Sequence, residues 1–408
     1  MKALIISAAF PPLRTGGADF VHRLGSELVA NGVDVTVIAS EGAVLHDDRI
    51  RLERVSKKWN WRTVQKCASH VRKLRPDVVD IVFTGWMYQD HPGITFLPVM
   101  IKQSFPSARV VVHIESLGGI RRDKSNFARA ASRFAASLIS GRKDISYEYG
   151  TLLRDSDAII TLSERDRDEL SKRHADVHGK SITIPPPPIM PVVEKLTEKE
   201  RQAGRRKLGL KDGSDLLLSF YGYIYPGKGL EILLEVVKRF NQQGRNLKLM
   251  IVGDVPEQYV LEREGKPDYL ADLKKLARDL GIYERIIWSE YAAYGSTEPS
   301  AKLRLSDICV FPFESGINQH NSSFWFAAAH GLPIVATKSP TTEDIFVDKH
   351  NVIFAEPSDV SDLASKIDQL SKDKELKKHI GQEAEKLANT RFSWASAISH
   401  TLAVFSSV

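Results

Sequence analysis

Apolar residues along this chain gather in short β-prone runs that are separated by amphipathic stretches. Residues 2–8 form the first run, and apolar positions between Phe20 and Val29 then recur at helical spacing. Gly32 ends this predicted helix as a left-handed cap, and residues 33–38 form the second predicted strand. Strands that alternate with helices predict parallel pairing, because parallel neighbours need a long return connection.

The same alternation continues along the chain and is interrupted once. Further strands are predicted at residues 78–83, 109–114, 158–162, 216–222, 247–252, 285–288, 307–311 and 334–337, with helices between them. The interruption is the proline-rich run 184–191, which excludes helix and strand because proline lacks an amide donor and blocks helix geometry. We therefore predict an α/β protein with two Rossmann-like, doubly wound domains, residues 1–190 and 191–391, that face a cleft.

The composition is that of an ordinary globular protein. Of the 408 residues, 42% are hydrophobic and 26% are charged, which excludes a disordered or low-complexity chain. The two cysteines, Cys67 and Cys309, are too few for a disulfide framework or a cysteine-built zinc site. The apolar start is too short for a signal peptide, and no apolar run approaches the ~20 residues that span a bilayer. We expect a soluble, cytoplasmic protein.

The net charge of +6 is unevenly distributed. Residues 1–150 hold 22 Lys and Arg against 14 Asp and Glu, so the first part of the chain is basic and the remainder is slightly acidic. The basic stretch 121–143 has apolar residues at helical spacing, which favours contact with an anionic membrane face; a core-packed helix with a solvated basic face is the alternative. Nucleic-acid binding is not expected, because no motif interleaves aromatic and basic residues on a sheet.

Two predicted strand-to-helix turns carry glycines that suit an anion. Gly16 and Gly17 follow the first strand, where backbone amides at a helix N-terminus attract negative charge. Lys228, flanked by Gly227 and Gly229, stands at the equivalent place in the second domain, and its ammonium would supplement such amides around a diphosphate. The alternatives are a purely geometric glycine turn and an exposed lysine without a role.

A third polar loop follows the predicted strand 307–311. It holds Glu314, Ser315, Gly316, Ile317 and Asn318, and the next helix begins at Ser322 and Ser323. Serine hydroxyls and amides at a helix start can contact a phosphate, or the serines can simply cap the helix.

Together these segments resemble a known enzyme family. The resemblance is carried by Gly16-Gly17, by the turn 225–231, by the segment 326–337 and by the closing Phe392-Ser393-Trp394. It is to GT-B-fold glycosyltransferases of family 4, retaining enzymes that use nucleotide sugars in bacterial polysaccharide and surface-glycan synthesis. It implies a UDP- or GDP-sugar donor in the second domain and a glycan or polyprenyl-linked saccharide acceptor in the first. No other cofactor is implied, and a last helix, about 392–408, would return to the first domain.

The resemblance also implies roles for individual residues. Lys228 would contact the donor diphosphate, and Gly16 and Gly17 would lie against it from the acceptor side. His113, at the end of a first-domain strand, would reach the donor sugar; a histidine satisfied by backbone groups is the alternative. Glu314 would be the first carboxylate of the site. The remaining donor-binding candidates are Gly222, Tyr223, Ser315, Gly316, Ile317, Asn318, Ser322 and Ser323.

Several positions depart from the family pattern. Tyr223 stands where an arginine is usual, and Phe326 stands where a ribose-binding glutamate is usual. Alignment on Gly316 puts Ser315 at the first carboxylate, with Glu314 one residue early. His320 and Asn321 replace paired arginines, so phosphate contacts are expected from Ser322, Ser323 and helix amides. The two Asp-x-Asp segments, 155–157 and 166–168, are not expected to bind a metal.

Three functions remain open from the sequence. The favoured one is a retaining glycosyltransferase that works without a metal. The second is a partner subunit of the same fold that binds a nucleotide sugar without transferring it, because of the missing arginine and glutamate. The third is a nucleotide-sugar epimerase on a similar scaffold, which the transferase-like segments disfavour.

Overall fold

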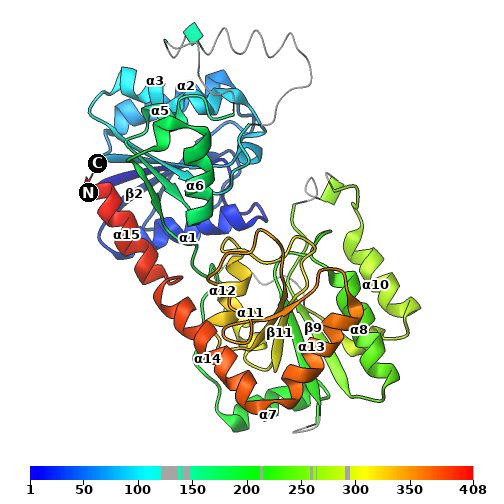
Figure 1. Cartoon of the computed structure of the whole chain (residues 1–408). Helices are drawn as coiled ribbons and strands as arrows, with labels where there is room; N and C mark the ends of the chain where they lie inside the picture. Colours follow the sequence, from blue (N-terminus) through cyan, green and yellow to red (C-terminus); the bar gives the residue numbers. More distant parts are fainter. Residues whose placement is uncertain are drawn as a thin grey trace. The chain divides into compact units, whose positions relative to one another are not determined.

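The chain folds into two compact α/β units (Figure 1). The computed structural model describes residues 1–120, 137–138, 141, 148–211, 215–257, 261–262, 264–289 and 295–407. Unit 1 is Met1–Pro185 together with Ala395–Val408, and unit 2 is Pro186–Trp394. The last helix, α15 (Trp394–Ser407), belongs almost wholly to unit 1. There Arg109 Nη1 donates a hydrogen bond of 3.1 Å to the carbonyl of the buried Phe405.

Unit 1 contains a seven-stranded sheet in the order β3-β2-β1-β4-β5-β6-β7. All its recorded strand pairs are parallel, and the order changes direction beside β1, as in doubly wound folds. The strands are β1 (Lys2–Ile6), β2 (Asp34–Ser40), β3 (Arg51–Val55), β4 (Val78–Phe83), β5 (Arg109–Ile114), β6 (Ala158–Thr161) and β7 (Ser181–Thr183). The helices are α1 (Gly16–Ala30), α2 (Trp61–Leu74), α3 (Leu97–Ser104), α5 (Leu152–Asp155) and α6 (Glu164–Arg173), with the short 3-10 helices η1 (Gly85–Tyr88), η2 (Pro92–Phe96) and η3 (Ala175–Val177).

Unit 2 repeats this plan with a six-stranded parallel sheet in the order β10-β9-β8-β11-β12-β13. The strands are β8 (Leu216–Tyr221), β9 (Leu247–Val252), β10 (Ile286–Ser289), β11 (Ile308–Phe311), β12 (Ile334–Thr337) and β13 (Ile353–Ala355). The helices are α7 (Glu198–Lys207), α8 (Leu230–Gln242), α10 (Tyr269–Asp279), α11 (Glu298–Leu303), α12 (Ser322–Ala328), α13 (Val360–Lys372) and α14 (Lys374–Thr390), with the 3-10 helix η4 (Tyr283–Arg285).

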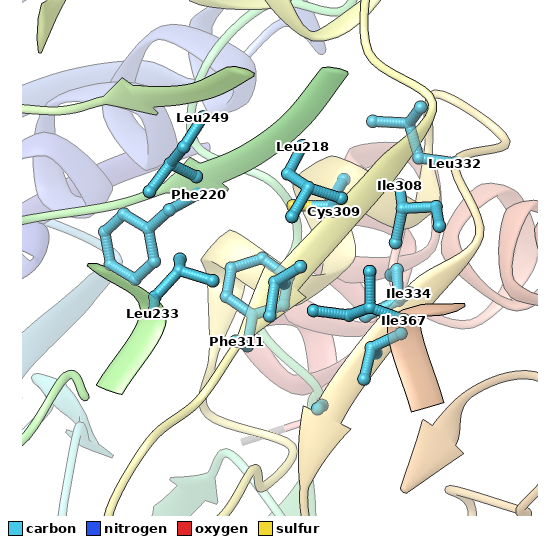
Figure 2. Close-up of a cluster of buried hydrophobic side chains, with 14 of the residues drawn as sticks. Leu218, Phe220, Leu233, Leu249, Ile308, Cys309, Phe311, Leu332, Ile334 and Ile367 are labelled. Carbon is cyan, nitrogen blue, oxygen red and sulfur yellow. The ribbon is translucent and has the colours of Figure 1, made fainter. Parts of the chain in front are cut away.

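The core of unit 2 fixes where its loops emerge. Leu218 and Phe220 of β8 meet Leu233 of α8 and residues of β9, β11 and α13 on one face of the sheet (Figure 2). Tyr221, the next residue of β8, faces the other way and packs on Phe326 of α12. Because both faces are buried, the parallel strands are held in register and their carboxyl ends form one edge of the sheet.

The predicted fold class is confirmed: the chain has two doubly wound α/β units with parallel sheets. Each of the ten strands predicted from the sequence is present, with ends that differ by at most two residues. The prediction misses β3, β7 and β13, which all lie at sheet edges. β7 and β13 have only three residues each, and β3 (Arg-Leu-Glu-Arg-Val) is mostly polar, so none of the three has a long apolar run that marks a buried strand.

Candidate functional site

The turn between β8 and α8 depends on glycine at three places. Gly222, Gly227 and Gly229 all have positive φ, a backbone conformation that other residues adopt at a cost. Gly229 precedes α8 as its N-cap residue and supplies no side chain to the amides of the first turn. A Cβ at Gly229 would lie 1.9 Å from the carbonyl oxygen of Pro312, so the turn packs directly on the loop that follows β11.

Lys228 extends from this turn over two aromatic rings. Its ammonium nitrogen lies 4.1 Å from the centre of the Phe313 ring and 4.8 Å from that of Tyr225. Among the described residues no carboxylate is recorded within ion-pair distance of Lys228. The charge is therefore not neutralised by a protein group there and is available to an anion beside the start of α8.

The loop between β11 and α12 is folded by hydrogen bonds of its own. The amide of Ile317 donates to Thr337 O at 3.0 Å, and that of Asn318 donates to Asn321 Oδ1 at 2.8 Å. Gly316 has φ +69°, and a Cβ there would lie 2.7 Å from Ser339, so the loop requires glycine at this position. Glu314 and Ser315 are exposed, and the Glu314 amide donates to Gly227 O at 3.0 Å, which joins this loop to the Lys228 turn.

Helix α12 begins at Ser322, as predicted, but neither serine caps it. Asn321 occupies the N-cap position, and no side-chain cap bond is formed there. Ser323 lies beside Gly222: a Cβ at Gly222 would be 3.6 Å from Ser323 Cβ and 3.8 Å from its Oγ. The start of α12 and the end of β8 are thus neighbours, and Gly222, Lys228, Glu314, Gly316 and Ser323 gather at the carboxyl edge of one sheet.

The departures from the family pattern have different surroundings. Phe326 is fully buried, with ring centres 4.4 Å from Tyr221 and 4.7 Å from His330, so a core side chain occupies this position. Tyr223 is half-buried in the turn after β8. His320 is half-buried, and its amide donates to Asn318 Oδ1 at 3.1 Å.

The sequence reasoning missed two acidic residues at this edge. Asp254 follows β9, and its carbonyl accepts from the Ile224 amide at 2.8 Å, while a Cβ at Gly253 would lie 1.9 Å from Gly222 O. Glu343 Oε2 accepts from the Gln319 amide at 3.0 Å. Asp254 could have been found from the sequence, because the Gly253-Asp254 pair directly follows a predicted strand. Glu343 gave no such signal, because the loop that carries it has no motif.

In unit 1 the corresponding turn lies between β1 and α1. Thr15 is the N-cap residue, and its hydroxyl accepts from the Ala18 amide at 3.2 Å. A Cβ at Gly17 would lie 2.2 Å from the terminal carbon of Met87, whereas a Cβ at Gly16 would have no neighbour within 4 Å. Both glycines belong to the first turn of α1, whereas the sequence pattern predicts them in the turn just before the helix.

His113 lies on β5 and is only 2% exposed. Its ring meets Phe20 edge to face at 5.2 Å, and neither ring nitrogen has a hydrogen-bond partner among the described residues. Burial lowers the pKa of His113 to about 4, so the ring is neutral at pH 7. Asp80 on the neighbouring β4 faces the same side of the sheet; it is fully buried, and burial with the nearby Glu115 charge raises its pKa to about 8.

The basic cations of the segment 121–143 lie outside the described residues. Across the described ranges, no helix is both long and apolar enough to cross a membrane. The described residues also hold no group of three or more His, Cys, Asp or Glu side chains placed to bind a metal ion.

Two α/β units of this topology are those of the GT-B fold, which comparison with a solved structure supports. Anabaena HepE, in a complex with UDP and glucose, superposes with a TM-score of 0.71 over 100% of both chains at 15% sequence identity. Residues 15–186 match the "Glycosyl transferase 4-like domain" and residues 200–387 match "Glycosyl transferases group 1". These two models cover most of the chain, which therefore belongs to the group 1 glycosyltransferase family.

Curated relatives match over part of their length. A D-inositol 3-phosphate glycosyltransferase of Streptomyces bingchenggensis is 28% identical over 255 residues, which are 61% of this chain and 52% of that protein. A lipopolysaccharide 1,2-N-acetylglucosaminetransferase of Salmonella typhimurium is 24% identical over 198 residues, 47% of this chain and 48% of that protein. The matches thus span about half the length of these two relatives.

Proposed function

We propose that the protein is a retaining glycosyltransferase that moves a sugar from a nucleoside-diphosphate sugar to a glycan or lipid-linked acceptor. The acceptor would be a polyprenyl-linked saccharide or a growing glycan in the synthesis of a polysaccharide or surface glycan. No metal or other cofactor is proposed. The observation that carries the proposal is the carboxyl edge of the unit 2 sheet, where Lys228 has no acidic partner within the described ranges and stands beside the uncapped start of α8.

The chemistry requires stabilisation of a leaving diphosphate. As the bond from the anomeric carbon to the diphosphate oxygen breaks, negative charge grows on that oxygen. The Lys228 ammonium and the amides at the start of α8 would stabilise this charge, with the Ser322 and Ser323 hydroxyls as further donors. In a retaining reaction, the acceptor oxygen forms its bond on the face that the diphosphate leaves, and the acceptor proton passes to a diphosphate oxygen.

The donor is proposed to be a UDP- or GDP-sugar. Anabaena HepE binds UDP and glucose, which makes a UDP-sugar the first choice to test here. Glu314 is exposed on the loop that also carries Ser315 and Gly316, and we propose that it contacts the donor sugar. His113, neutral at pH 7, would act as a hydrogen-bonding group toward the sugar rather than as a cation.

A thermal-shift screen against UDP, GDP, ADP and CMP tests the donor site. A ligand at ~100 times its dissociation constant stabilises the folded protein by about 2.7 kcal/mol, which is a measurable rise in Tm. The Lys228→Ala variant should lose most of this rise. It should also lose sugar transfer by about 100-fold, because a charge-assisted contact to the leaving group is worth about 3 kcal/mol.

The Lys274→Ala variant is the matched control. Lys274 also lies over an aromatic ring, that of Trp288 at 5.7 Å, but it projects from α10. It should keep the full nucleotide shift. An undiminished shift in Lys228→Ala would remove Lys228 from the site, and no shift with any of the four nucleotides would contradict the donor proposal.

The second candidate function is a partner subunit that binds a nucleotide sugar without transferring it. It is favoured by Phe326, a core residue at the place of the family glutamate, and by Tyr223 at the place of the arginine. Donor turnover separates the two functions. Sugar transfer or slow donor hydrolysis by the purified protein supports the transferase, whereas tight nucleotide binding with neither supports the partner subunit.

We also propose peripheral contact of unit 1 with the cytoplasmic, anionic face of a membrane. Helix α2 supports this because its exposed side is strongly basic. Between residues 56 and 76 there is no acidic residue, and the exposed cations are Lys57, Lys58, Arg62, Lys66, Arg72, Lys73 and Arg75. Trp61, 37% exposed at the start of the helix, adds an aromatic side chain suited to the membrane interface.

Vesicle pelleting tests this contact. The protein should pellet with vesicles of phosphatidylcholine containing phosphatidylglycerol at low salt, and an Arg62→Glu, Lys66→Glu, Lys73→Glu variant should bind them less. No pelleting at low salt, or equal pelleting with neutral vesicles, would contradict an electrostatic membrane contact.

A further inference from the structure

In the part of the chain that the structure describes, the Lys228 ammonium lies over ring faces and is not paired with a carboxylate. Phe313 lies closest, with its ring centre 4.1 Å from Nζ, and Tyr225 follows at 4.8 Å. These distances are within the range of cation–π attraction, in which the negative face of the ring draws the cation. Phe313 is 3% exposed, so the ammonium rests on a desolvated ring, where this attraction is strongest.

Phe313 is itself held firmly. Its ring packs on those of Phe311 and Phe220, with centres 5.5 and 6.4 Å away. Its carbonyl accepts hydrogen bonds from the Gly316 amide and from the Thr337 hydroxyl. The ring therefore has little freedom to move, and a cation lying on its face takes up a defined position.

The kind of partner matters for anion binding. A carboxylate beside Lys228 would fix the ammonium but would compete with a phosphate for it. A ring face fixes the ammonium and leaves its positive charge available. It also reduces the loss of side-chain freedom when an anion binds, because a long lysine side chain is otherwise mobile.

We propose that Phe313 is a positioning residue for the donor diphosphate: its ring face holds the Lys228 ammonium beside the start of α8, ready for the phosphates. The inference rests on the proposed function, because it assumes that Lys228 contacts a diphosphate. Phe313 does not touch the donor in this proposal and acts only through Lys228. Tyr225 supports the same cation from a half-buried position.

The experiment measures the UDP dissociation constant by calorimetry; GDP or ADP replaces UDP if it gives the larger thermal shift. Phe313 is replaced by phenylalanines with one, two and three ring fluorines, which keep its shape and progressively weaken the negative ring face. The dissociation constant should rise stepwise, by about fivefold at full fluorination, in line with a desolvated cation–π contact. Phe313→Leu, which removes the ring face, should weaken UDP binding by a similar factor.

Two controls separate positioning from packing. Phe311 is buried in the same cluster and packs on Phe313, but the Lys228 ammonium lies over Phe313 and Tyr225; Phe311 receives the same fluorines and should leave UDP binding unchanged (Figure 2). In a Lys228→Met background, fluorination of Phe313 should have no effect on UDP binding, because the cation is gone.

The outcomes are distinguishable. Equal effects of fluorination at Phe313 and Phe311, or an effect that persists without the Lys228 charge, would overturn the positioning role. Unchanged UDP binding across the fluorinated Phe313 series would overturn it as well, while the donor site itself would stand. If the wild-type protein bound none of the nucleoside diphosphates, the proposed function would fail, and this inference with it.

Discussion

In each unit a turn joins the first strand to the helix that follows it, and the two turns treat the start of that helix differently. In unit 1 the Thr15 hydroxyl accepts the Ala18 amide, so α1 is capped by its own chain. In unit 2 the N-cap residue of α8 is Gly229, which has no side chain to offer. Because uncapped amides attract an anion, the second turn fits the proposed diphosphate contact better than the first, and Lys228 stands beside it.

Certain buried ionisable side chains differ in the opposite sense, since those in unit 1 lack hydrogen-bond partners within the described ranges and one in unit 2 has them. In unit 1, Asp80 and His113 are buried without hydrogen-bond partners among the described residues. In unit 2, His330 Nε2 lies 2.6 Å from Ser300 Oγ and its Nδ1 lies 2.6 Å from Phe326 O, so both nitrogens are satisfied. In the described part of the chain, the buried histidine of the unit 1 sheet, His113, thus lacks the partners that the buried His330 of unit 2 has.

The largest expected effect concerns the uncapped turn. Gly229→Ala should destabilise the protein by about 3 kcal/mol, because a left-handed φ of +67° is costly for alanine and its Cβ would meet the Pro312 carbonyl at 1.9 Å. Urea denaturation at pH 7 measures this. Gly16→Ala, in the capped turn of unit 1, is the control and should change stability by less than about 0.5 kcal/mol, because no atom lies near its Cβ. Similar losses in both variants would mean that the turns do not differ.

The next effect concerns the unsatisfied carboxyl of unit 1. Asp80 has a pKa of about 8 in the folded protein against ~4 when unfolded, so its contribution to stability is full below about pH 4 and is lost as pH rises through 8. Asp80→Asn removes this titration and should stabilise the protein by about 2 kcal/mol at pH 7.

Denaturation at pH 5, 7 and 8 checks the sign. The gain from Asp80→Asn should grow as pH rises, because only the wild-type folded state carries a proton that the unfolded state has lost. A gain that is equal at the three pH values would trace the effect to packing. If Asp80→Asn lost stability instead, the Asp80 carboxyl would have to be stabilised by a hydrogen-bond partner in the folded protein.

The smallest effect concerns the capped turn. Thr15→Ala should cost about 1 kcal/mol, because it removes the acceptor of the Ala18 amide at the start of α1. Thr15→Ser keeps a hydroxyl and should restore most of this stability. Calorimetry measures the Tm of both variants: it should fall in Thr15→Ala and stay close to the wild-type value in Thr15→Ser. If Thr15→Ala does not lower the stability, the Thr15 cap does not satisfy the first amides of α1 any better than those of α8 are satisfied.

Much of the fold was predictable because buried strands carry apolar runs. The central strands of both sheets, such as Val78–Phe83 and Leu247–Val252, follow the sequence pattern residue for residue. Edge strands such as Arg51–Val55 have one exposed side and lack this signal, so they are found only through their pairing with a neighbour, here β2.

The candidate site was predictable where glycine was required. Gly229 and Gly316 adopt positive φ, and their place after strands was visible in the sequence. The contact of Lys228 with Phe313 was not predictable, because it joins residues 85 positions apart through the packing of two loops. The absence of a serine cap on α12 likewise depends on the loop around Asn318 and Asn321, whose hydrogen bonds compete with capping.

The assignment of α15 to unit 1 has a consequence for protein synthesis. Its Phe405 is buried there, and Arg109 donates a hydrogen bond to the Phe405 carbonyl. The ribosome makes the first strands of unit 1 well before this helix, so unit 1 remains incomplete until residues 395–407 have emerged. Unit 2, whose residues are contiguous, becomes complete earlier, which reverses the usual order in which the first-made domain is finished first.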